Sequence, residues 1–137
     1  MAVGLVIVSH SARLAEGVVE LAGQMARGAV RLVAAGGTDD GALGTSLGKV
    51  LSGIDAADAG EGVLLLVDLG SAGLVAEMAL EQLSEPQRAR VRLSGAPLVE
   101  GAVVAAVEAS VGSTLEDVAR TAEEAIDRKS TRLNSSH

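Results

Sequence analysis

Four short apolar segments alternate along the chain with longer segments in which apolar residues recur every three or four positions. The apolar segments are Val3–Val8, Ala29–Gly37, a run that begins at Gly62, and a run that ends at Pro97. Continuous apolar runs of this length are typical of strands buried on both faces of a parallel sheet. The alternation therefore predicts an α/β fold: a doubly wound, open parallel sheet of about four strands with helices on both faces.

Each periodic segment predicts a helix with an apolar stripe. The stripes are Leu14, Val18, Leu21 and Met25, then Leu47, Val50, Leu51 and Ile54, then Val75, Met78 and Leu83. Two more helices are predicted at about 98–111 and 114–126, the last capped by Ser113 or Thr114. We expect one domain over residues 1–126. Residues 127–137 are a polar tail without periodicity, which we expect to be unstructured or foreign to the native protein.

Composition excludes several classes of function. The chain has no Phe, Tyr or Trp on which bases would stack, and its net charge of −7 opposes binding to nucleic acid. It has no Cys, and His10 is its one histidine before the last residue, so we expect no metal site. No apolar run approaches the roughly 20 residues of a membrane helix, and the first one has no basic residues before it. We expect a cytoplasmic protein that binds neither nucleic acid nor membrane.

Two polar residues come directly after predicted strands. His10 follows the run VGLVIVS, and Asp68 follows GVLLLV. In open parallel sheets, ligands bind beyond the carboxyl ends of the strands, at the point where strand order reverses. If the first strand is central, His10 and Asp68 meet at that point. A carboxylate that accepts a hydrogen bond from one imidazole nitrogen leaves the lone pair of the other free as a nucleophile.

The residues around this pair are suited to an anion. The stretches HSAR and GSAG each open a predicted helix, where backbone N–H groups attract phosphate, and Ser11, Ser71 and Thr45 add hydroxyl donors. Together these groups predict an acceptor for a phosphoryl group on His10.

Plainer interpretations fit the same residues. A histidine at a strand end is often only solvated, and Asp68 fits equally well as the N-cap of the next helix. Thr45 or Ser46 is as plausible a helix cap as a ligand donor, and the glycines fit turns. Neither a phosphate-binding P-loop nor a Gly-x-Ser-x-Gly hydrolase motif is present.

Four stretches resemble one known family in their order along residues 1–126. They are GLVIVSHSARLAEGVVELAGQM, AAGGTDDGALGTS, LLLVDLGSAGLVAEMALEQL and VRLSGAPLVEGAVVAAVEAS. They are similar to the phosphotransferase subunits of phosphoenolpyruvate-dependent dihydroxyacetone kinases, within the mannose-type enzyme IIA family of the bacterial sugar phosphotransferase system.

The resemblance implies that His10 is the phosphorylated residue and that Asp68 is its acidic neighbour. Gly70 and Ser71 match the turn after that acid, and Gly44 and Thr45 match the second loop, so these four and Ser11 are expected to bind the phosphate. The implied donor is the histidine-containing phosphocarrier protein. The implied acceptor is ADP, regenerated as ATP on the kinase's nucleotide-binding subunit, with no cofactor on this chain. The family also implies a homodimer.

Two other functions remain open. The same fold serves as the enzyme IIA component of a mannose-type sugar transporter, in which a sugar-specific enzyme IIB drains the phosphate. A regulatory binding domain that uses the same cleft without covalent chemistry is the third candidate.

Overall fold

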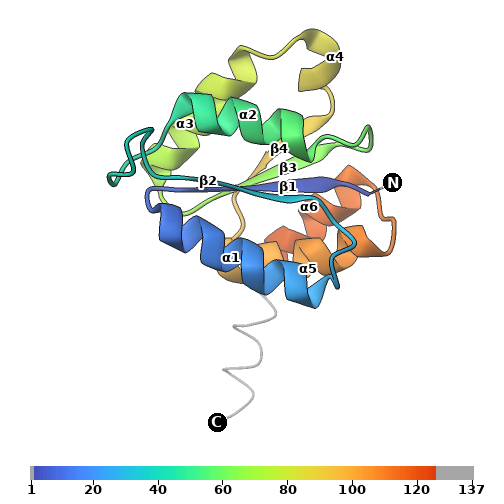
Figure 1. Ribbon diagram of the computed structural model, residues 1–137. Helices are drawn as coiled ribbons and strands as arrows, with labels where there is room; N and C mark the ends of the chain where they lie inside the picture. The colour runs from blue at the N-terminus through green and yellow to red at the C-terminus, as the bar shows by residue number, and fades with distance from the viewer. Residues whose placement is uncertain (1, 126–137) are drawn as a thin grey trace.

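The apolar segments form four parallel strands that lie side by side in the order β2-β1-β3-β4. Figure 1 shows the computed structural model, which describes residues 2–125, and the predicted tail lies outside that part of the chain. The strands are β1 (Gly4–Ser9), β2 (Leu32–Gly36), β3 (Val63–Val67) and β4 (Val91–Ser94). All three strand pairings are parallel. The predicted fold class is confirmed.

Helices cover both faces of the sheet (Figure 1). On one face lie α1 (Ala12–Met25), α5 (Leu98–Ser110) and α6 (Leu115–Glu123). On the other lie α2 (Leu47–Ala57) and α3 (Gly70–Glu81), with the short α4 (Glu85–Arg88) after them. Alternate residues of β1 enter the two cores, Leu5 and Ile7 on one side and Val6 and Val8 on the other. No helix within residues 2–125 has the length and apolar character needed to cross a membrane.

The structure adds one short helix to the prediction and selects one of the two predicted caps of α6. The single turn of α4 was not predicted; Ser84 caps it by accepting from the Gln87 N–H, and Pro86 stands in its first turn. For α6, the cap is Thr114 rather than Ser113, because the Thr114 hydroxyl accepts from the Asp117 N–H at 3.2 Å.

The buried face of α1 is not the predicted apolar stripe. Of the four stripe positions only Val18 is buried, while Leu14, Leu21 and Met25 are 42–55% exposed. The helix instead turns Ala15 and Ala22 toward the sheet. Close approach of helix and sheet explains this choice, since a Cβ on Gly36 would lie 2.8 Å from the Ala15 Cβ. In this core, which has no aromatic rings, small side chains on α1 let the helix pack directly against the sheet.

The strand order reverses between β1 and β3. From β1 the chain passes to β2 on one side, and then crosses to β3 and β4 on the other. The first strand is therefore central, as predicted, and its carboxyl end lies beside that of β3. Val8 pairs with Val67, and the Asp68 N–H extends the ladder by donating to the Val8 carbonyl at 3.2 Å.

The contact between Gly36 and α1 predicts unequal effects of two glycine substitutions. A Cβ at Gly36 would lie 2.5 Å from the Ser11 carbonyl oxygen, whereas one at Gly17, within α1, meets nothing within 4 Å. We expect Gly36→Ala to lower the free energy of unfolding by about 1–3 kcal/mol. Gly17→Ala is expected to raise it by about 0.5–1 kcal/mol. Urea denaturation measures both, and equal changes would contradict this packing.

Candidate functional site

His10 and Asp68 meet at the carboxyl ends of β1 and β3. The His10 Nδ1 lies 3.1 Å from Asp68 Oδ1, with the two side chains 26% and 11% exposed. Residue 10 follows the last residue of β1, and residue 68 follows the last residue of β3, so the parallel register alone brings their backbones together. The predicted pairing of the two side chains is confirmed.

The Asp68 carboxylate accepts four hydrogen bonds. Its Oδ2 accepts from the Ser9 hydroxyl at 2.9 Å and from the His10 backbone N–H at 3.0 Å. Its Oδ1 accepts from the Leu69 N–H at 2.8 Å and faces His10 Nδ1. Burial raises the pKa of Asp68, but the hydrogen bonds from His10 and Ser9 outweigh it, so the pKa lies below its usual value. Asp68 is therefore a carboxylate at neutral pH.

This carboxylate fixes the proton on the imidazole ring. An ionised carboxylate only accepts hydrogen bonds, so His10 Nδ1 must carry the N–H that is donated to it. In the neutral ring, Nε2 then keeps its lone pair. The Ser71 Oγ lies 2.5 Å from Nε2 and is the donor of that hydrogen bond. The atom available for nucleophilic attack is Nε2, on the side of the ring turned away from Asp68.

The alternative role of Asp68 as a helix cap does not match the structure. The N-cap of α3 is Leu69, which has no side-chain capping bond, and Asp68 accepts only from Leu69 among the residues of that turn. The Ser46 side chain, in contrast, does cap α2 by accepting from the Lys49 N–H at 3.2 Å.

The other predicted site residues surround the pair to different extents. Ser11 caps α1, since its hydroxyl accepts from the Leu14 N–H at 3.2 Å. Gly70 opens α3 next to Ser71 and is exposed. Gly44 holds the loop after β2 against the site, because its N–H donates to the His10 carbonyl at 2.9 Å. That N–H is thus engaged with the backbone of the site.

Thr45 lies beside the site without a contact to the pair. It forms an isolated bridge with Gly37, and its Oγ1 is buried without a hydrogen-bond partner in the described part of the chain. A buried hydroxyl without a partner lowers the stability of the fold, and the Thr45 O–H is available to donate a hydrogen bond to a ligand at this loop.

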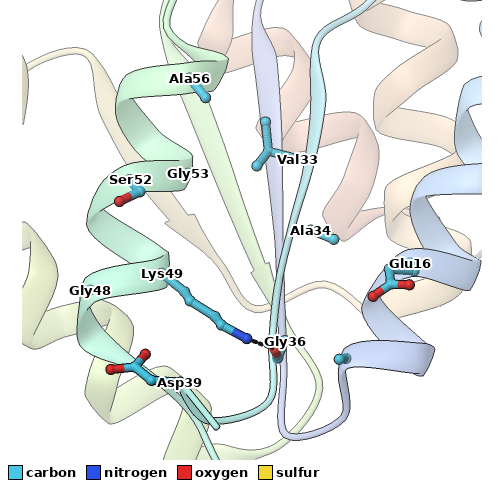
Figure 2. A pocket seen from close by; sticks show the side chains of 11 residues that line it. Glu16, Val33, Ala34, Gly36, Asp39, Gly48, Lys49, Ser52, Gly53 and Ala56 are labelled. Atoms are coloured by element: carbon cyan, nitrogen blue, oxygen red, sulfur yellow. Dashed lines mark hydrogen bonds between the residues drawn. The ribbon is translucent and has the colours of Figure 1, made fainter. Parts of the chain in front are cut away.

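Two of the hollows in the described part of the chain lie near β1 and β2. One, of about 500 Å³, is largely apolar and lies beside Asp68, between Leu14 of α1 and the start of α5 at Leu98 and Val99. The other, of about 580 Å³, runs along the open edge of β2 between α1 and α2 (Figure 2). In Figure 2 the Lys49 side chain reaches across it, and its Nζ donates to the Gly36 carbonyl at 2.9 Å. This second hollow contains neither His10 nor Asp68. Within residues 2–125, no three His, Asp or Glu side chains gather as a metal site.

Sequence reasoning missed Ser9 as part of this site. It is the last residue of β1 and is fully buried, which made it resemble the rest of an apolar strand. Its position at the carboxyl end of the first strand was the available signal, because ligands bind beyond the carboxyl ends of parallel strands.

Comparison with known proteins assigns the chain to a family. Residues 4–119 match EIIA-man, the PTS system fructose IIA component. The chain belongs to this family. The matched range includes both His10 and Asp68, and the family resemblance predicted from the sequence is confirmed.

Curated relatives carry more specific names. A phosphoryl donor subunit, DhaM, of PEP-dependent dihydroxyacetone kinase from Klebsiella michiganensis is 45% identical over 134 residues, which is 96% of this chain and 28% of that protein. The chain thus spans about a quarter of that relative. The phosphotransferase subunit DhaM of a PTS-dependent dihydroxyacetone kinase from Lactococcus lactis is 34% identical over 94% of this chain and 100% of that protein.

A solved structure has the same arrangement. The protein of unknown function EF1359 superposes with a TM-score of 0.79 at 36% identity, over 90% of this chain and 95% of that one. The fold is therefore shared with a relative of known structure.

The hydrogen bonds to Asp68 predict a pH-dependent contribution to stability. Because the folded-state pKa lies below the unfolded one, about 3.9, the stabilisation is complete above the unfolded value and is lost as the pH falls through the folded value. We expect Asp68→Asn to lower the free energy of unfolding at pH 7 by about 1–3 kcal/mol. The difference from the unsubstituted protein should shrink below about pH 4.

Urea denaturation from pH 7 to pH 3 measures this difference. Asp117→Asn is the control, since it removes a carboxylate from an exposed pair with Arg120 and is expected to change stability little. A difference for Asp68→Asn that is independent of pH would show that the ionised carboxylate is not what stabilises the fold.

Proposed function

We propose that this chain is a phosphoryl-relay subunit of a dihydroxyacetone kinase, with His10 as the covalent carrier. The observation that carries the proposal is the arrangement of the His10 ring, with Nδ1 donating to ionised Asp68 and Nε2 presenting its lone pair. The similarity to phosphoryl donor and phosphotransferase subunits named DhaM supports dihydroxyacetone kinase as the system in which the chain acts.

The first transfer is an attack by Nε2 on phosphorus. The phosphoryl donor is the phosphohistidine of a histidine-containing phosphocarrier protein. A P–N bond forms to His10 while the P–N bond of the carrier breaks, and the electron pair of the broken bond stays on the carrier's imidazole. The proton on Nδ1 does not move, so the phosphorylated ring is cationic and is stabilised by the Asp68 carboxylate.

The second transfer passes the group to ADP. An oxygen of the terminal phosphate of ADP, held on the kinase's nucleotide-binding subunit, attacks the phosphorus. The P–Nε2 bond breaks and its electron pair returns to Nε2, which restores the neutral ring. The ATP so formed phosphorylates dihydroxyacetone on the kinase.

The start of α3 supports a phosphoryl group on Nε2. Ser71 lies in the first turn of this helix and contacts Nε2, so the ring nitrogen faces the helix N-terminus. The unpaired N–H groups and the dipole there attract an anion. On phosphorylation, the Ser71 hydroxyl that donates to Nε2 is free to donate to a phosphoryl oxygen. Ser11, Gly70 and Thr45 are proposed to add further donors, and Gly44 to position the loop.

The hollow beside Asp68 supports nucleotide binding on the partner subunit rather than on this chain. Its lining of Leu14, Leu69 and Val99 is suited to side chains of a docking protein rather than to a charged nucleotide. We therefore assign ADP and ATP to the partner subunit. We also propose that the chain is a homodimer, as its family resemblance implies, which equilibrium sedimentation tests directly.

Replacement of His10 tests the covalent step. With phosphoenolpyruvate, enzyme I and the phosphocarrier, we expect an acid-labile, base-stable phosphoprotein whose intact mass rises by one phosphoryl group. His10→Gln should abolish the label. A label that persists at the same level in His10→Gln would refute the assignment, and no mass change in the unsubstituted chain would favour a regulatory binding domain. Draining of the label by a sugar-specific enzyme IIB, and not by the kinase's ADP-loaded subunit, would point to the sugar-transporter function.

Replacement of Asp68 tests how the ring is held. Asp68→Asn removes the charge that stabilises the phosphorylated ring, and an amide does not enforce the proton on Nδ1. We expect phosphorylation of His10 to slow by about 10–100-fold, the scale seen when a partner that orients a functional histidine is lost. Rapid-quench kinetics measure the rate, and an unchanged rate would remove Asp68 from the relay.

A further inference from the structure

We propose that Ser9 is a positioning residue of the site: its buried hydroxyl holds Asp68 in the orientation that keeps the His10 proton on Nδ1. The inference rests on the proposed function of His10 only for its kinetic consequence. Its structural part, the control of a tautomer, is independent of what the site transfers.

The hydrogen bonds of Ser9 define which way its hydroxyl points. The Ser9 side chain is fully buried. Its Oγ accepts from the Ser11 backbone N–H at 3.0 Å and lies 2.9 Å from Asp68 Oδ2. An amide N–H only donates, and an ionised carboxylate only accepts. The hydroxyl proton of Ser9 must therefore point at Asp68.

This bond limits rotation of the carboxylate. Oδ2 has two donors, the Ser9 hydroxyl and the His10 N–H, while Oδ1 has Leu69 N–H and the imidazole. Without the Ser9 hydroxyl, Oδ2 keeps a single backbone donor, the His10 N–H, and the carboxylate turns more easily about its Cβ–Cγ bond. The acceptor of the Nδ1–H bond is then held less firmly, so the tautomer with its lone pair on Nε2 is favoured less strongly.

Ser9 also connects the two elements that flank the ring. Through Ser11 N–H it joins the start of α1, and through Asp68 it joins the end of β3. One hydroxyl thus ties both sides of the switch point to the strand that carries His10.

The chain contains a matched control for the structural part of this role. Ser94 ends β4, is 2% exposed, and accepts from the backbone N–H two residues later, that of Ala96, at 3.1 Å. Ser9 accepts from Ser11 in the same way at the end of β1. Ser94 has no hydrogen bond to His10 or Asp68 among the described residues. Removing its hydroxyl costs the same turn contact without touching the carboxylate.

The test compares Ser9→Ala with Ser94→Ala in the full chain. Nitrogen-15 NMR of the imidazole gives the fraction of neutral His10 that carries its proton on Nδ1. We expect that fraction to be near complete in the unsubstituted protein and in Ser94→Ala, and to fall clearly in Ser9→Ala. Phosphorylation of His10 by the phosphocarrier should slow about 10-fold in Ser9→Ala, through kcat with KM unchanged, and stay at the original rate in Ser94→Ala.

The other possible results also test the role of Ser9. An unchanged tautomer in Ser9→Ala, or an equal fall in Ser94→Ala, would overturn the inference. If Ser9→Ala does not fold, Ser9→Cys, whose thiol is a weaker donor of similar shape, is measured instead with the same expected fall. Absence of phosphorylation in the unsubstituted protein would refute the proposed function, while the tautomer measurement would still decide the role of Ser9.

Discussion

Parallel pairing between β1 and β3 is the constraint on which the site depends. The register sets Val8 opposite Val67, so the residues after each strand emerge at the same edge of the sheet. The strand order reverses at this pair. The histidine and the carboxylate are 58 positions apart in sequence, yet the strand register brings their backbones side by side, within reach of a hydrogen bond between the side chains.

The cores on either side keep that register rigid with small and aliphatic side chains. Because a strand slip by one residue would exchange its two faces, the alternation of Leu5 and Ile7 with Val6 and Val8 resists any other pairing. Alanine-rich faces of α1 and α5 let the helices approach the sheet closely. The site therefore stands on elements that have little freedom to move apart.

The sequence predicted the features that depend on local pattern. Continuous apolar runs identified the strands, and the polar residues at their ends identified His10 and Asp68. The pattern did not predict which face of α1 is buried, because hydropathy ranks Leu14 and Met25 above Ala15, whereas the close contact with Gly36 admits only the alanine. It also missed the role of Ser9, because a serine at the end of an apolar run does not by itself reveal a hydrogen bond to a carboxylate 59 positions away.

The Lys49 side chain in the groove of Figure 2 has a consequence for the open edge of the sheet. Arg31 O and Gly37 N are bonded to β1, so the alternate residues of β2 direct their backbone groups outward, and Gly36 is one of them. Its carbonyl is an acceptor that a further strand would need, and the Lys49 ammonium already occupies it. A charged group at an edge strand is a common protection against unwanted sheet extension. The Lys49 ammonium therefore opposes the addition of a further strand to the sheet at β2.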